Sequence, residues 1–382
     1  MIEPAQAHDI SRAAVSTVAW LLATRYGRRV RAAILYETGE PLRVEDVDVD
    51  PPQAGEVAIR MAASGVCHSD LHVVDGIHPH PRPAILGHEG AGVVEAVGPG
   101  VTGIGLGDHV LLSWLPYCGR CRFCVAGRPN VCENLGWSDA GLMMDGTTRF
   151  HRNGTAIHHS TTSSFGERTV VPAQTAIPID PSLPLAEMAL MGCAVMTAFG
   201  AVLNTAKVRP GDSVAVVGCG GVGLNIVQAA AVAGAGEIVA VDPSPAKHEL
   251  AREMGATRTC SPEEAAESVR VDHSFEAVGP LATIELAVSL TARGGQAILV
   301  GMAPPDARPS FDALSLTMDE KAIRGCWYGS CRPQADFPML VSLYRAGRLR
   351  LDPLIERCGL DDINTAFERI RRGEAVRSVI VY

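Results

Sequence analysis

A glycine-rich turn between a strand and a helix constrains the fold of this chain more than any other feature. The apolar run "SVAVV" at residues 213–217 leads directly into "GCGGVG", and an Ala-rich stretch with helical character follows. Gly218 permits the tight turn, Gly220 lets backbone N–H groups approach a pyrophosphate, and Gly223 allows close packing of helix on strand. The helix N-terminus adds a positive dipole. We therefore predict a dinucleotide site formed by Gly218, Gly220, Gly221, Val222 and Gly223.

An acidic residue after the next strand indicates which dinucleotide is preferred. Asp242 ends the run "EIVAVD", nineteen residues beyond Gly223. A carboxylate there can accept hydrogen bonds from the adenosine ribose hydroxyls and would repel the additional phosphate of NADP, so NAD is predicted. Lys247 follows within reach of the same ribose, although an ordinary surface lysine would fit the same sequence context.

The chain divides into two parts with different patterns. Residues 32–171 contain short strands separated by Gly and Pro, which is typical of a β-rich unit, whereas apolar strands alternate with helices from about residue 195. We expect an α/β protein with a β-rich catalytic domain of residues 30–194 and 327–382 and a parallel-sheet cofactor domain of residues 195–326. Residues 1–29 are predicted to be an N-terminal extension without fixed structure, and a valine start codon at Val30 is a further hypothesis.

Composition excludes several classes of partner. A net charge of -9 with no basic run argues against nucleic acid, which leaves a small molecule as the expected partner. The apolar run at residues 14–23 is shorter than the roughly 20 residues of a membrane helix and precedes no cleavage site, so we expect no membrane segment. Eleven cysteines without a signal peptide predict metal ligands or free thiols in the cytoplasm.

Four cysteines follow one another in "CGRCRFCVAGRPNVC". Three thiolates at intervals of three residues and a fourth one short loop away can surround one ion tetrahedrally. A closed set of four sulfur ligands predicts structural zinc, with an iron–sulfur cluster and unmetallated thiols as the alternatives. The residues concerned are Cys118, Cys121, Cys124 and Cys132.

A second set of metal ligands is more dispersed. Cys67 in "GVCHSDLH", His88 in "LGHEG" and Cys193 in "MGCAV" could supply two thiolates and an imidazole, leaving a fourth zinc position open for water or substrate. Taken singly, the cysteines could equally be small core residues and the histidine a polar residue near a turn.

Several of these segments, in order, carry a resemblance to a known family. "GVCHSDLH", "GHEGAGVV", the four-cysteine lobe, "GCAVMTAFGAVLNTAKVRPGDSVAVVGCGGVG" and "VRSVIVY" together resemble the zinc-containing medium-chain alcohol dehydrogenases, from about residue 30 to residue 382. The resemblance implies a GroES-like catalytic domain, a Rossmann cofactor domain, NAD, and two zinc ions per chain, one catalytic and one structural. It also implies reversible hydride transfer between an alcohol and NAD, with zinc as Lewis acid.

The resemblance further implies roles for individual residues. Cys67, His88 and Cys193 would hold the catalytic zinc, and Glu89 would orient or transiently replace a ligand. Asp70 would fix the tautomer of His88. Ser69 would hydrogen-bond the alcohol, and His72 would be the terminal base of the proton path, reached through the cofactor ribose. His68 and Arg377 would contact the cofactor pyrophosphate.

Substrate identity is less constrained. Trp114 lies where relatives place a pocket-lining aromatic residue, and residues 145–171 resemble the longer loop of dimeric branches, which favours a homodimer. Gly136 stands where glutathione-dependent enzymes carry an arginine. We predict a dehydrogenase of primary or aromatic alcohols and aldehydes. The alternatives are a mycothiol-type formaldehyde dehydrogenase, an alcohol dehydrogenase with a tightly held cofactor, and a nucleotide- and zinc-binding protein without turnover.

Overall fold

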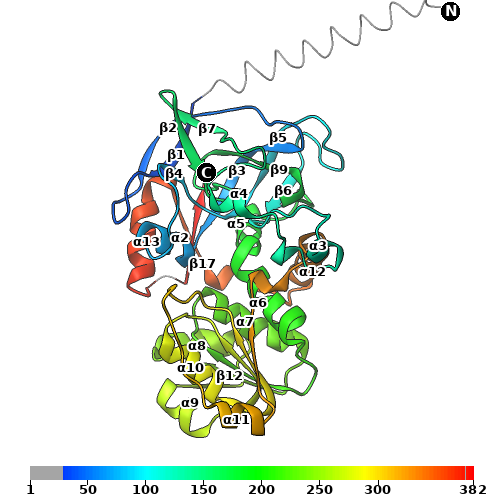
Figure 1. Cartoon of the computed structure of the whole chain (residues 1–382), viewed down its shortest axis with the longest axis vertical. Coiled ribbons are helices and arrows are strands. Elements are labelled where there is room, and N and C mark those ends of the chain that lie inside the picture. The colour runs from blue at the N-terminus through cyan, green and yellow to red at the C-terminus, as the bar shows by residue number, and fades with distance from the viewer. Residues whose placement is uncertain (1–28, 375) are drawn as a thin grey trace, which may run out of the picture.

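The computed structural model describes residues 29–374 and 376–382. The predicted N-terminal extension, the apolar run at residues 14–23 and the hypothesis of a start at Val30 therefore concern residues that lie, Arg29 and Val30 excepted, outside the described part. In Figure 1 a β-rich half lies above a layered half of helices and strands, and the chain passes from the first to the second near α6. This arrangement confirms the predicted α/β class.

The lower half contains a 6-stranded sheet in the order β13-β12-β11-β14-β15-β16, and every pairing in it is parallel. Alternate residues of one strand enter different cores: Val214 and Val216 pack with helix α7, whereas Ala215 and Val217 pack with α9 and α10. Both faces are therefore covered, which explains the nearly continuous apolar strands. The strands are β11 (Ser213–Val217), β12 (Glu237–Val241), β13 (Arg258–Cys260), β14 (Val271–Glu276), β15 (Thr291–Leu299) and β16 (Ala322–Gly325). The helices are α7 (Gly221–Ala233), α8 (Pro245–Glu253), α9 (Pro262–Ser268), α10 (Leu281–Ser289) and α11 (Ala313–Met318).

The upper half combines a closed barrel, β1-β2-β7-β8-β4, with a sheet in the order β10-β6-β5-β3-β18-β17, to which β9 is added through β3. Its strands are short apart from β3 and β5, as the Gly and Pro spacing indicates. They are β1 (Val30–Leu35), β2 (Arg43–Val49), β3 (Glu56–Val66), β4 (Ala84–Ile85), β5 (Glu89–Val97), β6 (His109–Leu112), β7 (Phe150–Arg152), β8 (Thr155–His159), β9 (Arg168–Pro172), β10 (Ala176–Ile179), β17 (Ile355–Cys358) and β18 (Arg377–Val381).

The C-terminal segment returns to the first half of the chain. Strand β18 pairs antiparallel with β3, and Ser378 faces Val66 in that pairing. Short helices complete this half: α2 (His68–Val74), α3 (Arg122–Val125), η1 (Pro129–Val131), α4 (Gly136–Asp139), η2 (Ala173–Thr175), η5 (Tyr328–Ser330), α12 (Pro333–Arg345), η6 (Asp352–Leu354), η7 (Leu360–Asp362) and α13 (Ile363–Arg371). The domain boundaries at residues 194/195 and 326/327 stay predictions.

A continuous helical stretch joins the two halves, and it is irregular. It runs through α5 (Leu185–Leu190), a π-helical turn η3 (Met191–Val195), α6 (Met196–Gly200) and a second π-helical turn η4 (Ala201–Ala206). Leu185–Ala206 is long and apolar enough to cross a membrane by length and composition, but 83% of its most apolar window is buried inside the protein. Such burial is that of a core helix.

A buried ion pair ties the barrel to the long strand β3. Arg149 donates through Nε to Oε2 of Glu56 at 2.9 Å and through Nη2 to Oε1 at 2.7 Å, and both side chains are less than a tenth exposed. Arg149 also bonds Asp145 at 2.6 Å. Since two charges have been removed from water here, each depends on the other.

Removing one member of this pair should be costly. We expect Arg149→Met to lower the free energy of unfolding by about 3–5 kcal/mol, because the Glu56 carboxylate stays buried without its partner. Arg350→Met, which breaks a half-exposed ion pair with Glu253, should cost at most about 1 kcal/mol. Urea unfolding followed by circular dichroism measures both values, and similar midpoints for the two variants would contradict the expectation.

Candidate active site

Strand pairing brings the dispersed ligands together. Cys67 directly follows β3 and begins helix α2, while His88 directly precedes β5. Because β3 and β5 are antiparallel with Gly65 opposite Glu89, the two ligands meet at one end of the sheet. Cys193 arrives from the π-helical turn η3. A π turn displaces the side chains that follow it, which is how a cysteine of a core helix can face a site.

The resulting group fits a metal ion. One ligand atom from each of Cys67, His88, Glu89 and Cys193 lies within 4.8 Å of all the others. Two thiols, an imidazole and a carboxylate in a buried setting suit zinc, and the carboxylate can leave a position open. A hydrogen bond from the Cys193 thiol lowers the pKa of Cys67 well below its ordinary value, and the Arg377 and His88 charges act in the same direction.

Asp70 and Ser69 orient the imidazole. Oδ1 of Asp70 lies 3.1 Å from Nδ1 of His88 and also accepts the backbone N–H of Gly87 at 3.1 Å. This contact places the proton on Nδ1 and leaves Nε2 free as a ligand. Ser69 Oγ lies 3.3 Å from Nε2 and 3.2 Å from Cys67 Sγ. The hydroxyl is therefore beside two of the candidate ligands.

Glu89 and Arg377 form a buried ion pair next to these ligands. Arg377 Nη2 donates to Glu89 Oε1 at 2.6 Å, and both side chains are almost fully buried. Gly65 makes room, because a Cβ there would lie 2.1 Å from Glu89 Oε2. Burial raises the pKa of Glu89 to about 7, although Arg377 opposes the shift.

The same arginine contacts the nucleotide turn. A Cβ on Gly221 would lie 2.6 Å from Arg377 Nε, so the guanidinium packs directly against the start of α7. Arg377 was predicted to contact a pyrophosphate, and it lies between the glycine turn and the metal group. That role stays a prediction.

The turn itself has the geometry that its glycines predict. Gly218 has a φ of 96°, and a Cβ on Gly223 would lie 1.7 Å from the carbonyl oxygen of Gly218. Gly220 caps helix α7 without a side chain, so the first helical N–H groups are available to a phosphate. Asp242 accepts the N–H of Cys219 at 2.9 Å, and Lys247 Nζ lies 3.5 Å from the same carboxylate. The residues thus fit a dinucleotide.

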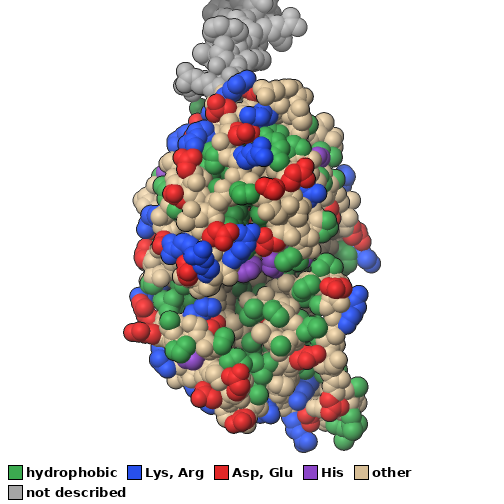
Figure 2. Space-filling view, turned by 90° about the vertical axis from the view of Figure 1, so that its left-hand side faces the viewer, with side chains coloured by type: hydrophobic (Ala, Val, Ile, Leu, Met, Phe, Trp, Pro, Cys, Tyr) green, Lys and Arg blue, Asp and Glu red, His purple; other side chains and the backbone are tan. Residues whose placement is uncertain are grey.

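Three imidazoles form a row beside the ligands. The ring of His72 lies 5.1 Å from that of His68 and 5.3 Å from that of His78. Burial, with the neighbouring His68 and His78, lowers the pKa of His72, and its Nδ1 has no hydrogen-bond partner among the described residues. Figure 2 shows histidine side chains at the rim of a hollow between the two halves. His78 was not among the predicted site residues; its only signal in the sequence was its place after the "GVCHSDLH" segment and just before Pro79.

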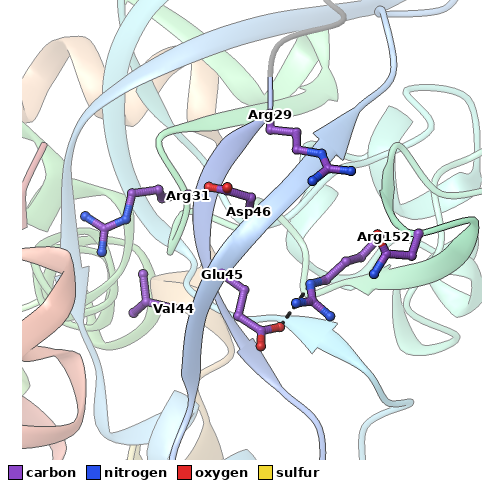
Figure 3. A pocket seen from close by; sticks show the side chains of 7 residues that line it. Arg29, Arg31, Val44, Glu45, Asp46 and Arg152 are labelled. Carbon is purple, nitrogen blue, oxygen red and sulfur yellow. Dashed lines mark ion pairs between the residues drawn. The ribbon is translucent and has the colours of Figure 1, made fainter.

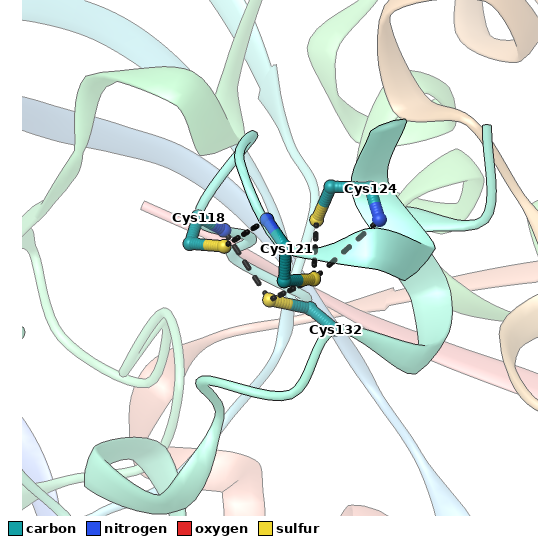
Figure 4. A group of neighbouring side chains, drawn as sticks. All are labelled: Cys118, Cys121, Cys124 and Cys132. Atoms are coloured by element: carbon teal, nitrogen blue, oxygen red, sulfur yellow. Dashed lines mark hydrogen bonds between the residues drawn. The ribbon is translucent and has the colours of Figure 1, made fainter. Parts of the chain in front are cut away.

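The four predicted lobe cysteines also converge (Figure 4). Cys121 Sγ lies 3.5 Å from Cys124 Sγ and 3.9 Å from Cys132 Sγ, and all eleven cysteines are free thiols. A backbone N–H from Arg120 and the Asn134 amide lower the pKa of Cys118 to about 6, whereas burial raises that of Cys124 to about 12. Four thiolates this close need a cation, and the geometry fits zinc.

Aromatic side chains lead outward from the metal group. The Trp114 ring stands edge-on to His88 at 6.3 Å and to Trp327 at 5.3 Å, and packs on Tyr328 at 4.5 Å. Trp327 is 45% exposed, so the row runs from a metal ligand to solvent. The sequence analysis named Trp114 and missed Trp327, because the two are more than two hundred residues apart.

A surface pocket elsewhere has different chemistry. It lies on the barrel, lined by Arg29, Arg31 and Arg152 together with Glu45 and Asp46 (Figure 3). Arg152 Nε lies 3.1 Å from Glu45 Oε2 within the pocket, whereas Arg29 and Arg31 pair with carboxylates outside its lining.

A Rossmann-type sheet joined to a β-rich domain with a thiol–imidazole metal group defines a metal-dependent nicotinamide dehydrogenase. Residues 53–181 match the family model "Alcohol dehydrogenase GroES-like domain", and residues 221–346 match "Zinc-binding dehydrogenase". The S-(hydroxymethyl)glutathione dehydrogenase of Synechocystis sp. is 40% identical over 92% of this chain and 99% of its own length. The NDMA-dependent alcohol dehydrogenase of Amycolatopsis methanolica is 38% identical over 93% and 99%. The benzyl alcohol dehydrogenase structure from Acinetobacter calcoaceticus superimposes with a TM-score of 0.88 at 32% identity, covering 93% and 99%.

The chain belongs to the zinc-containing medium-chain alcohol dehydrogenase family. The predicted GroES-like and Rossmann folds, the alcohol dehydrogenase class, and zinc with a nicotinamide cofactor are thereby confirmed. The roles of single residues stay predictions, and the structure brings together every residue predicted for the catalytic metal group and for the lobe.

The two metal groups should lose zinc independently. We expect Cys121→Ser and Cys193→Ser each to retain about half of the zinc bound by the parent chain, because each removes one ligand from one site. Cys121→Ser should also lower the melting temperature, since its group closes a loop of the fold. Metal analysis of purified protein, with Cys358→Ser as a control outside both groups, checks this. Full zinc content in both variants would refute the assignment.

Proposed function

We propose that this protein oxidises primary and aromatic alcohols reversibly to aldehydes with NAD as the acceptor. One observation carries the proposal: Arg377 links the buried Cys67–His88–Cys193 group to the glycine turn through its contacts with Glu89 and Gly221. A substrate held at the metal group would therefore lie next to the cofactor site. When bound, zinc supplies a Lewis acid and NAD accepts a hydride.

The side chains of this chain handle the proton. Ser69 Oγ, beside two of the ligands, is placed to accept the hydroxyl proton of an alcohol. Asp70 holds His88 in one tautomer. His72, whose pKa is lowered by burial and by its neighbouring imidazoles, has an unpartnered Nδ1 that can accept a proton.

The pocket wall favours flat, apolar substrates. Trp114 and Trp327 present perpendicular indole rings along the route from His88 to solvent, and aromatic rings prefer such edge-to-face or offset contacts. The similarity to a structure named benzyl alcohol dehydrogenase supports this choice. Asp242, beside the nucleotide turn, supports NAD over NADP.

A thiol adduct of formaldehyde is the second candidate substrate. It is favoured by relatives named S-(hydroxymethyl)glutathione dehydrogenase at 39–40% identity. Against glutathione itself, Gly136 begins the short helix α4 and has no side chain to bind a carboxylate. The relative named NDMA-dependent alcohol dehydrogenase supports testing for a cofactor that does not exchange.

The assembly and compartment are part of the same proposal. Residues 145–171, expected as a long loop, form β7, β8 and most of β9 in the structure, and their resemblance to the corresponding segment of dimeric branches supports a homodimer. Eleven free thiols support a reducing compartment, the cytoplasm.

An assay with a panel of alcohols tests the activity. The zinc-loaded protein should reduce NAD with benzyl alcohol and with straight-chain primary alcohols. We expect the larger kcat/KM for benzyl alcohol, because its aromatic ring can contact both indoles and a straight chain cannot stack on them. Formaldehyde with and without a low-molecular-weight thiol addresses the second candidate, and NAD released on denaturation reveals a retained cofactor. No reduction of free or retained NAD by any alcohol, at full zinc content, would refute the proposed function.

His72 should govern the pH dependence of alcohol oxidation. We expect His72→Gln to lower kcat on the order of 10²-fold near pH 7, because the amide cannot accept a proton, with partial recovery at higher pH or with added imidazole. In the parent enzyme the lowered pKa keeps His72 neutral to below its ordinary titration range, so activity should decline only under more acidic conditions. His151→Gln, a barrel histidine paired with Asp50, is the control. An unchanged pH profile in His72→Gln would argue against the relay.

A further inference from the structure

The cysteine lobe is in direct contact with the wall of the substrate pocket. Asn130 lies in the turn η1, two residues before Cys132, and its side chain is buried at 3% exposure. Its Nδ2 donates to the backbone carbonyl of Trp327 at 3.1 Å, across almost two hundred residues of sequence. The reverse orientation of the amide would set two oxygens against each other, so the donor assignment is fixed by chemistry.

The turn that carries Trp327 is also held through the residues that follow it, and Tyr328 OH lies 3.4 Å from Ser113 Oγ as well. Tyr328, Gly329 and Ser330 are all left-handed, with φ of 51°, 65° and 49°. Tyr328 OH donates to the Gly192 carbonyl at 2.5 Å, and Ser330 Oγ lies 2.8 Å from Thr205 Oγ1. These contacts fix the residues after Trp327 to the helical stretch that bears Cys193.

Trp327 itself has one fixed side and one open side. Its ring packs edge-on against Trp114 at 5.3 Å, yet the residue is 45% exposed. Among the described residues, Asn130 makes the one side-chain hydrogen bond to the backbone of Trp327, whose carbonyl also accepts the N–H of Ser330 at 3.0 Å within the turn. A lobe that carries no reacting group thus contacts the backbone from which this indole extends.

We propose that Asn130 is a positioning residue for substrate specificity: it holds Trp327 as the outer wall of the pocket, so that the cysteine lobe sets the preference for aromatic over short alcohols. This inference rests on the proposed function. Ethanol is too short to extend from the metal group past Trp114, whereas a benzyl ring held there would reach toward the two indoles. Loss of the Asn130 bond should therefore weaken binding of the ring without slowing the reaction at the metal.

Steady-state kinetics of the full, zinc-loaded chain test the proposal. Asn130→Asp replaces the donor with an oxygen at nearly constant volume, and should raise KM for benzyl alcohol about tenfold while kcat and the KM for ethanol change less than about twofold. Trp327→Ala should show the same selective loss, and Asn130→Asp should add little to it in the double variant, because both act through one contact. Glu133→Gln, the opposite exchange at an exposed lobe position paired with Arg122, should leave both KM values unchanged.

A second measurement is independent of turnover. Near-ultraviolet circular dichroism of the perpendicular indole pair should change in Asn130→Asp as it does in Trp327→Ala, at unchanged zinc content. If Asn130→Asp lowers the zinc content of the lobe, Asn130→Ala allows the same circular dichroism comparison without adding a charge.

The outcomes distinguish the positioning role of Asn130 from the proposed function. Equal effects on both alcohols, or effects of Asn130→Asp and Trp327→Ala that simply add, would overturn the positioning role while leaving the proposed function intact. Failure of the parent chain to oxidise either alcohol would contradict the proposed function and the inference with it.

Discussion

The ion pair between Glu89 and Arg377 joins three parts of the chain that are distant in sequence. Glu89 follows the ligand His88 at the start of β5, Arg377 begins the last strand, and the guanidinium packs on Gly221 at the start of α7. Removing either partner from so buried a pair typically costs about 3–5 kcal/mol. The metal group and the C-terminal strand are therefore coupled through two buried charges, and the nucleotide turn packs against the same guanidinium.

The two metal groups depend on different kinds of contact. The lobe thiols receive backbone N–H groups from their own loop, as Cys118 does from Cys121 and Cys124 from Gly119, so the lobe organises itself largely by local structure. The thiols of the other group come from a strand end and a π-helical turn, and they meet because the helical stretch that bears Cys193 packs on strands β3 and β5. A closed local site stabilises, whereas an open site assembled from distant elements can admit a substrate and sense the cofactor.

The nucleotide turn and the cysteine lobe could be predicted from the sequence because their motifs are local. The glycine turn needs only a strand before it and a helix after it, and the four lobe cysteines lie within fifteen residues. Cys67, His88 and Cys193 were not convincing from spacing alone, because their meeting depends on the pairing of β3 with β5 and on a π turn that no local pattern marks. The pairing of Asp70 with His88 likewise followed from family resemblance and not from spacing. Trp327 and Asn130 carried no signal at all, since each acts through a neighbour from another part of the chain, and His78 had only its place after the "GVCHSDLH" segment.

The strained turn at Tyr328 shows why such contacts escape a reading of the sequence. Two non-glycine residues in left-handed conformation, Tyr328 and Ser330, cost about 1–2 kcal/mol each, and no local preference would select them. The turn exists because Gly200 and Gly329 let two backbones approach, a Cβ on Gly200 being only 2.1 Å from the Gly329 oxygen. Hydrogen bonds to Gly192 and Thr205 offset the strain. The helix that presents Cys193 thus also fixes the segment behind Trp327, and the position of the ligand and the shape of the pocket are set by one packing contact.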